Sequence, residues 1–153
     1  MTAPSTAAVG PDAGNTPLGT LFRWLAALLF IAVVVQVGLA GYGAFHAVHA
    51  ADHRSISKKT IENAFNPHIA LGYIIVLVML VLFLVALAGR LGRRNVKLSG
   101  AIVVLGIVQA ILGIASESTP AIGPLHTINA LGIFATTGLL AHRTMARRRR
   151  TAL

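Results

Sequence analysis

Four stretches of the chain contain no Asp, Glu, Lys or Arg, and each is about as long as a helix that crosses a membrane. They are residues 24–51, 63–89, 98–116 and 118–142. A helix needs roughly 20 apolar residues to cross the hydrocarbon core of a bilayer. Lipid leaves only helices and closed barrels as spanning structures, and these stretches lack the alternation of barrel strands. The sequence therefore predicts an all-α integral membrane protein, a bundle of four transmembrane helices.

The polar ends of the chain set the expected domain boundaries. Residues 1–20 are small, polar and punctuated by proline, which is typical of a disordered tail. Residues 21–143 hold the transmembrane domain, and residues 144–153 form a basic tail. Asn66 is the expected N-cap of the second helix, with Pro67 in its first turn, and Pro124 has the same place in the fourth. We expect the four spans at about residues 21–45, 67–89, 96–116 and 124–142, with one sizeable connection at 47–66.

The formal charge of +9 is concentrated on one side of the predicted membrane. Basic residues follow the second and fourth spans, whereas Glu117 is the only charged residue in the connection after the third span. This is the positive-inside pattern of a protein with both termini in the cytoplasm. It makes the lipid bilayer the expected partner and gives no reason to expect nucleic-acid binding. The residues concerned are Arg90, Arg93, Arg94, Lys97, Arg143 and Arg147–Arg150.

The two halves of the predicted bundle resemble one another. Gln36, Ala40 and Gly43 on the first span are spaced i, i+4, i+7, and Gln109, Gly113 and Ser116 repeat that spacing on the third. Each half continues with a connection, a proline and a histidine. The chain thus reads as two tandem helical hairpins, which are related by an axis along the membrane normal. Such an axis places the two histidines opposite each other, at one depth, on diagonal helices.

These histidines, His68 and His126, are the strongest candidate site. Each is followed four residues later by a small residue, Gly72 or Ala130. Ionisable residues within spans usually face the bundle interior and mark function. Haem iron takes axial imidazoles from two helices, and small residues leave room for the macrocycle. The pattern predicts a b-type haem, and the alternative is a pair of interfacial histidines bonded to loop carbonyls.

Gln36 and Gln109 lie further along the same predicted interior. Buried amides of this kind hydrogen-bond across transmembrane helices, so packing is their first role, and a place beside the cofactor is the second. The chain has no cysteine, which excludes disulfides, thiolate metal sites, iron–sulfur clusters and covalent c-type haem.

A second group of histidines marks the end of the first span. His46, His49 and His53 are spaced i, i+3 and i+7, with Asp52 nearby, and a helix would bring them to one face. They could hold a divalent metal ion there. The alternative is the solvated end of a helix.

The segment "VQAILGIASESTPAIGPLHTINALG" at 108–132 resembles the third-to-fourth helix region of the haem A synthase family, and "NPHIALGYI" at 66–74 resembles its second-helix entry. The resemblance implies a four-helix half with haem-ligating histidines at His68 and His126. The chain has one such half where the enzymes have two, and it has no cysteine. Glu62, the one weak catalytic candidate, precedes His68 by six positions, whereas the family's acidic residue lies close to the histidine. The layout also resembles short four-helix bacterial membrane proteins of unknown function.

The sequence thus favours a multi-pass protein of the bacterial cytoplasmic membrane that binds haem b for electron transfer and is not an enzyme. One alternative is a cofactor-free structural or accessory subunit of a larger membrane complex. Another is a half-size haem-modifying enzyme, which would need a homo-oligomer to rebuild the two-half arrangement.

Overall fold

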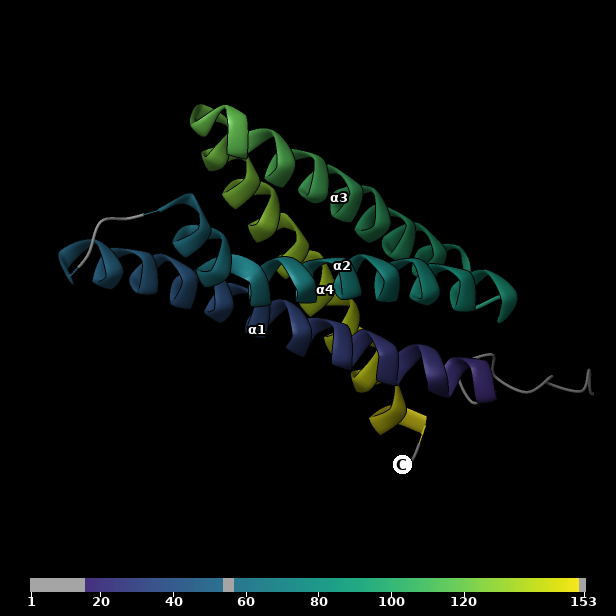
Figure 1. Cartoon of the computed structure of the whole chain (residues 1–153). Helices are drawn as coiled ribbons and strands as arrows, with labels where there is room; N and C mark the ends of the chain where they lie inside the picture. Colours follow the sequence, from purple (N-terminus) through teal and green to yellow (C-terminus); the bar gives the residue numbers. More distant parts are fainter. Residues whose placement is uncertain (1–15, 54–56, 152–153) are drawn as a thin grey trace, which may run out of the picture.

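The computed structural model describes residues 16–53 and 57–151, and within them the chain forms four α-helices (Figure 1). These are α1 (Pro17–His53), α2 (Lys58–Ala88), α3 (Arg93–Ser118) and α4 (Gly123–Thr151). A short 3-10 helix, η2 (Pro120–Ile122), joins α3 to α4. The all-α four-helix architecture predicted from the charge-free stretches is confirmed.

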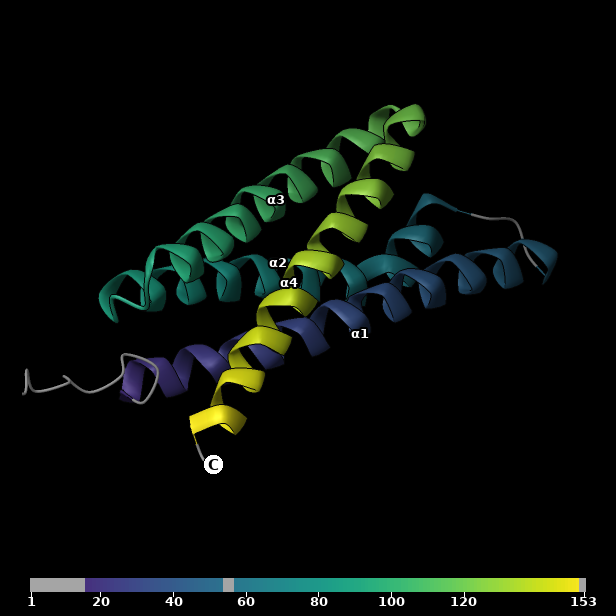
Figure 2. The same cartoon turned by 180° about the vertical axis from the view of Figure 1, so that it is seen from behind.

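The helices form two hairpins, and each helix packs against two neighbours. α1 packs against α2 and α3 against α4, while α2–α3 and α1–α4 contacts join the hairpins. α2 and α4 are therefore diagonal neighbours across the bundle. From both sides, the hairpins lie together along one part of their length and diverge toward the α1–α2 and α3–α4 connections (Figures 1 and 2).

The bundle has two chemically different ends. One, which we call the basic end, combines the start of α1, the α2–α3 connection and the end of α4. The other, the histidine end, combines the α1–α2 and α3–α4 connections with His46, His53, His68 and His126. Described cations of the basic end are Arg23, Arg90, Arg93, Arg94, Lys97 and Arg143.

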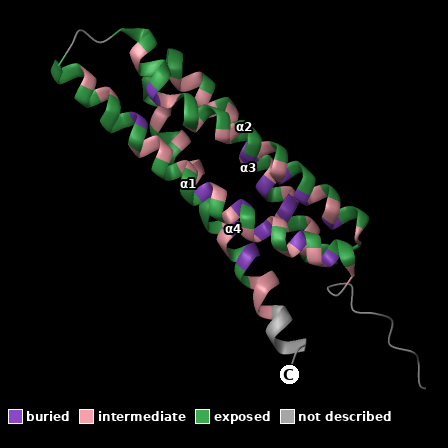
Figure 3. Ribbon diagram, turned by 60° about the horizontal axis from the view of Figure 1, so that its bottom comes forward, coloured by how far each residue is buried: buried purple, intermediate pink, exposed green. Residues whose placement is uncertain are grey.

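The apolar core lies in the half of the bundle nearer the basic end, where Figure 3 shows most of the buried residues. Leu82 and Ile102 are completely buried, and Phe22, Leu29 and Met79 are nearly so. Many other large apolar side chains, from all four helices, are exposed on the outside of the bundle. A soluble protein rarely leaves such continuous apolar surface in water, so lipid covers it here.

Within the described residues α1, α2 and α3 are long and apolar enough to cross a membrane. The chain is therefore a multi-pass membrane protein. α4 is more polar because His126, Thr127 and Asn129 occupy its first turns, yet it also exposes apolar side chains outward, among them Leu131. α1 has 37 residues. At 1.5 Å per residue it is about 55 Å long, well over the ~30 Å of bilayer hydrocarbon.

The predicted long connection at 47–66 is wrong, and so is the predicted start of the second helix at Pro67. α1 continues to His53, and α2 begins at Lys58, so that Pro67 lies inside α2. The true N-cap is Ser57, whose Oγ accepts a hydrogen bond from the Thr60 N–H at 3.2 Å. This cap stabilises the helix start, and packing of α2 against α1 adds to it, so the helix continues through Pro67 despite the hydrogen bond that its missing N–H removes.

The helices also extend into the expected tails. α1 begins at Pro17, four residues before the predicted boundary, because the Gly19 N–H donates to Thr16 Oγ1 at 3.1 Å and proline suits the first turn. Residues 1–15 lie outside the described part. At the other end α4 continues to Thr151, beyond the predicted boundary at 143. No Gly or Pro interrupts this segment.

Candidate functional site

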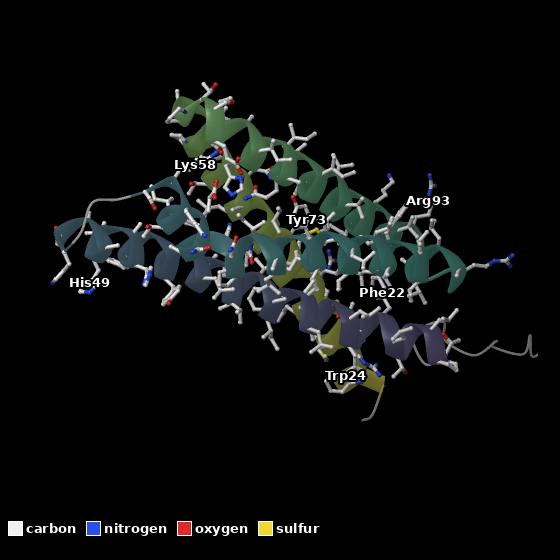
Figure 4. The ribbon with its side chains drawn as sticks, viewed as in Figure 1. Phe22, Trp24, His49, Lys58, Tyr73 and Arg93 are labelled. Carbon is white, nitrogen blue, oxygen red and sulfur yellow. The ribbon has the colours of Figure 1, made fainter. Side chains whose placement is uncertain are left out.

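His68 of α2 and His126 of α4 meet across the diagonal of the bundle. Their ring centres are 6.5 Å apart, and the ring planes are inclined by 61°. Both residues are half-buried. Figure 4 shows side chains with nitrogen and oxygen atoms gathered in this region, between the labelled Lys58 and Tyr73. The prediction that the two histidines meet on diagonal helices is confirmed, and their rings lie edge to face.

Each histidine ring is held by the neighbouring helix of its own hairpin. His68 Nδ1–H donates to the Gln36 carbonyl at 3.1 Å, and His126 Nδ1–H donates to the Gln109 carbonyl at 3.1 Å. A carbonyl oxygen can only accept, so both rings carry their proton on Nδ1. In a neutral ring with its proton on Nδ1, Nε2 is an electron-pair donor, which is the form that binds a metal.

In the α3–α4 hairpin the glutamine completes a chain of hydrogen bonds. Gln109 Nε2 donates to His126 Nε2 at 2.9 Å. Asn129 Nδ2 in turn contacts Gln109 Oε1 at 2.7 Å and the Leu105 carbonyl at 2.9 Å. Both ends of the Gln109 amide and both nitrogens of His126 are thereby satisfied.

The α1–α2 hairpin lacks this chain. Gln36 Nε2 donates to the His68 carbonyl at 2.7 Å, while Gln36 Oε1 is buried without a hydrogen-bond partner. Rotating the amide would set oxygen against oxygen, so the unpartnered acceptor is a property of the site. Leu71 stands three residues after His68, where the second half has Asn129 three residues after His126. No described residue hydrogen-bonds to His68 Nε2.

Glycines let the polar side chains approach the helices. A Cβ at Gly113 would come within 3.2 Å of His126 Cε1, and one at Gly72 within 3.1 Å of Gln36 Nε2. A Cβ at Gly43 would collide with the Phe65 ring at 2.8 Å. The space beside Gly72 is therefore filled by an amide, and the glycine against His126 is Gly113. The predicted small residue below it, Ala130, is half-buried.

The histidines at the end of α1 do not gather into a metal centre. His53 Nδ1 turns back to the His49 carbonyl at 2.9 Å, and the two rings lie 4.3 Å apart. His46 stacks on Tyr42 instead. In the described part of the chain, no group of three or more His, Cys, Asp or Glu side chains could hold a metal ion. The three-histidine metal site expected at His46, His49 and His53 is thus not formed.

Glu62, the weak catalytic candidate, faces away from the paired histidines. It lies on α2 with its side chain exposed and pairs with Lys58 at 3.5 Å. Six residues separate it from His68, which places the two side chains about 120° apart around the helix at 100° per residue. Glu62 supports the first turns of α2.

Residues 36–116 match a family of unknown function, DUF6220. This is more than half of the chain. The chain belongs to the DUF6220 family. No curated protein matches it, and no solved structure does either.

The DUF6220 match contains Gln36, His68 and Gln109 and stops before His126. In this DUF6220 chain, sequence reasoning found the two histidines and both glutamines but missed Asn129 and the role of Gly113. Asn129 could have been found, because it lies three residues after His126 and so on the same helix face. Comparing the halves position by position, with Leu71 against Asn129, would also have singled it out.

Proposed function

We propose that the protein binds haem b within the membrane, with His68 and His126 as axial ligands, and carries electrons. The observation that supports this most is the closeness of the two rings, which lie edge to face with 6.5 Å between ring centres. Two imidazoles that share one metal ion, each at about 2 Å from its ring nitrogen, have ring centres about 6 Å apart. The spacing between these helices therefore already suits a shared iron.

The hydrogen bonds of the rings support the same proposal. Histidines that bind metals almost always donate their other ring N–H to a carbonyl, carboxylate or water, which fixes the tautomer. His68 and His126 do so through Nδ1 to Gln36 and Gln109. Because both acceptors are backbone carbonyls, these two Nδ1 hydrogen bonds remain when a glutamine side chain is replaced.

Haem binding requires local rearrangement, because the space beside Gly72 is filled by the Gln36 amide and His126 Nε2 already has a hydrogen-bond partner. The Gln109 amide, which now donates to His126 Nε2, must turn away before that nitrogen can bind iron. His68 Nε2 needs no such change. Once bound, haem would supply one-electron redox chemistry. The role of the chain is to hold the two rings, keep both Nε2 atoms deprotonated and exclude water.

The experiment is the visible spectrum of the full chain, expressed with ample haem and purified in detergent. We expect a low-spin spectrum with bis-histidine ligation. His126→Ala should remove it, whereas His142→Ala, a histidine at the opposite end of the bundle, should leave it unchanged. A colourless wild-type preparation would contradict the haem proposal, and an unchanged spectrum of His126→Ala would contradict the ligand assignment.

A second candidate function is a cofactor-free subunit that packs within a larger membrane complex. Its specific support is the Gln109–His126–Asn129 chain, which satisfies its polar groups without any ligand. Gln109→Ala separates the two proposals. If haem binds, this variant keeps the spectrum because the backbone carbonyl remains. If the Gln109–His126–Asn129 hydrogen bonds serve packing alone, the variant is colourless like the wild type and loses stability.

We also propose that the basic end lies in the cytoplasm. Cations gather there, and the described carboxylates of Asp52, Glu62 and Glu117 all lie at the histidine end. A positive cytoplasmic side is the usual rule for membrane proteins. A reporter enzyme that works only in the cytoplasm should be active when it is fused after Leu153, and one that works only in the periplasm should be inactive there. Activity of a periplasmic reporter at the same point would reverse the orientation.

A further inference from the structure

A groove runs between α1 and α4 in the half of the bundle nearer the basic end. It has a volume of about 440 Å³. This lies within the ~300–1,000 Å³ of typical small-molecule sites. Its lining is mainly apolar, with Ala27, Phe30 and Ile31 from α1 and Gly138, Ala141 and Met145 from α4. His142 joins the lining near the basic end.

Small residues keep the groove open. A Cβ at Gly138 would come within 3.1 Å of Phe30 Cε2, so the glycine lets this ring lie directly against α4. Phe30 also packs on Phe134, with 5.3 Å between ring centres. Ala27 and Ala141 are too short to fill the space that remains.

Arg23 lies at the basic end of the same flank of α1. It precedes Ala27 by four residues and therefore lies one turn away on the same helix face. Its Nε atom is buried and has no hydrogen-bond partner. One terminal nitrogen donates to Thr20 Oγ1 at 3.3 Å. A buried guanidinium N–H without an acceptor is costly, and its preferred partner is a phosphate or carboxylate oxygen.

The described residues offer Arg23 no such partner. Every carboxylate side chain among them, Asp52, Glu62 and Glu117, is at the histidine end. The groups around the groove at the basic end are His142 and Arg143 of α4, which are neutral or positive. The guanidinium, which is partly exposed, therefore lies in surroundings that attract an external anion.

We propose that this groove binds an anionic phospholipid, with the phosphate on Arg23 and an acyl chain along the α1–α4 groove. Trp24 supports a position at the membrane surface, because it is 52 % exposed beside Arg23 and tryptophans are enriched at that boundary. The occupant is a lipid because the groove is apolar and lies on the lipid-covered surface, and Arg23 is one helical turn from Ala27 in its lining. Arginine binds phosphate oxygens through two parallel N–H bonds.

The proposal can be tested by native mass spectrometry of the full chain in detergent, mixed with phosphatidylglycerol or with phosphatidylcholine of the same acyl chains. We expect the anionic lipid to remain bound preferentially. Arg23→Gln should weaken its binding about tenfold, which corresponds to one charge-assisted hydrogen bond of ~1.5 kcal/mol. Arg23→Lys should fall between, because it keeps the charge and loses the two parallel bonds.

Two controls distinguish lipid binding in the groove from general attraction of anionic lipid to the basic end. Lys97→Gln removes a cation of the basic end on α3, and it should leave lipid binding close to wild type. Ala27→Leu fills the groove and should lower binding of the anionic lipid, whereas Ala101→Leu on the exposed face of α3 should not. Equal binding of the two lipids, or equal effects of Arg23→Gln and Lys97→Gln, would overturn the proposal.

Discussion

The α1–α2 and α3–α4 hairpins hold their histidines by the same backbone hydrogen bond but use their glutamines differently. Gln109 points its amide at the His126 ring and is itself held by Asn129. Gln36 points its amide at the His68 carbonyl and leaves its oxygen buried and unpartnered. The difference follows from one position, which is Asn129 in one half and Leu71 in the other.

The two histidines therefore have different properties. His126 is fixed on both nitrogens, so its half of the site is rigid and polar. His68 is fixed on Nδ1 alone, so its Nε2 is ready to accept a ligand. The two hairpins thus share the hydrogen bond that orients each histidine ring but differ in the hydrogen bonds of their glutamine side chains.

The largest effect is expected from removing either ring. His68→Ala and His126→Ala should each abolish the low-spin haem spectrum, since both axial ligands are needed. His126→Ala should also lower the free energy of unfolding more than His68→Ala, because it leaves the Gln109 amide unpaired. Spectra and SDS-induced unfolding of both variants measure this. Equal stability losses would contradict the asymmetry between the halves.

The next effect tests the difference at Asn129 directly. Asn129→Leu gives the second half the residue of the first and leaves Gln109 Oε1 without its donor. We expect a loss of about 1–2 kcal/mol in the free energy of unfolding, as for a buried unpaired polar group in a membrane protein. Thr127→Leu, on the exposed face of α4, is the control and should change little. If both variants unfold alike, Asn129 does not hold the site.

A smaller effect is expected at Gly113. Gly113→Ala introduces a Cβ 3.2 Å from His126 Cε1, so the ring must move by a few tenths of an ångström. We expect a cost of about 1 kcal/mol from this overpacking, seen as a lower thermal midpoint. Gly132→Ala is the matched control on α4, where nothing lies within 4 Å of the new Cβ. That variant should gain stability, and a gain at Gly113 as well would refute the close approach.

The smallest effect comes from repairing the first half. Leu71→Asn supplies a donor to Gln36 Oε1 but removes apolar packing, so the net change should be close to zero. A double-mutant cycle with Gln36→Leu isolates the new hydrogen bond. We expect a favourable coupling of about 0.6 kcal/mol, the usual value between transmembrane helices. A coupling of zero would mean that residue 71 does not reach the Gln36 amide.

Much of the fold could be predicted because lipid restricts the possible structures. Four charge-free stretches were enough to predict a four-helix bundle, and the repeat was enough to bring His68 and His126 together. The helix ends were harder to predict. Pro67 suggested that the second helix begins there, but α2 begins at Lys58 after the Ser57 cap. The cap and the packing of the bundle together stabilise the helix more than one proline destabilises it. At the site, the sequence indicated both histidines and both glutamines, but their hydrogen bonds depend on side-chain directions.

By itself, the sequence determined that the chain is all helical and membrane-spanning, and that its two halves correspond. Hydrophobic length and residue spacing contain that information, because both act along a single helix. Only the tertiary structure decided that the Gln109 amide meets His126 while Gln36 Oε1 stays unpaired, and that α1 and α4 leave a groove beside Arg23. These features depend on how closely neighbouring helices approach and on which residue of each hairpin fills the space between them.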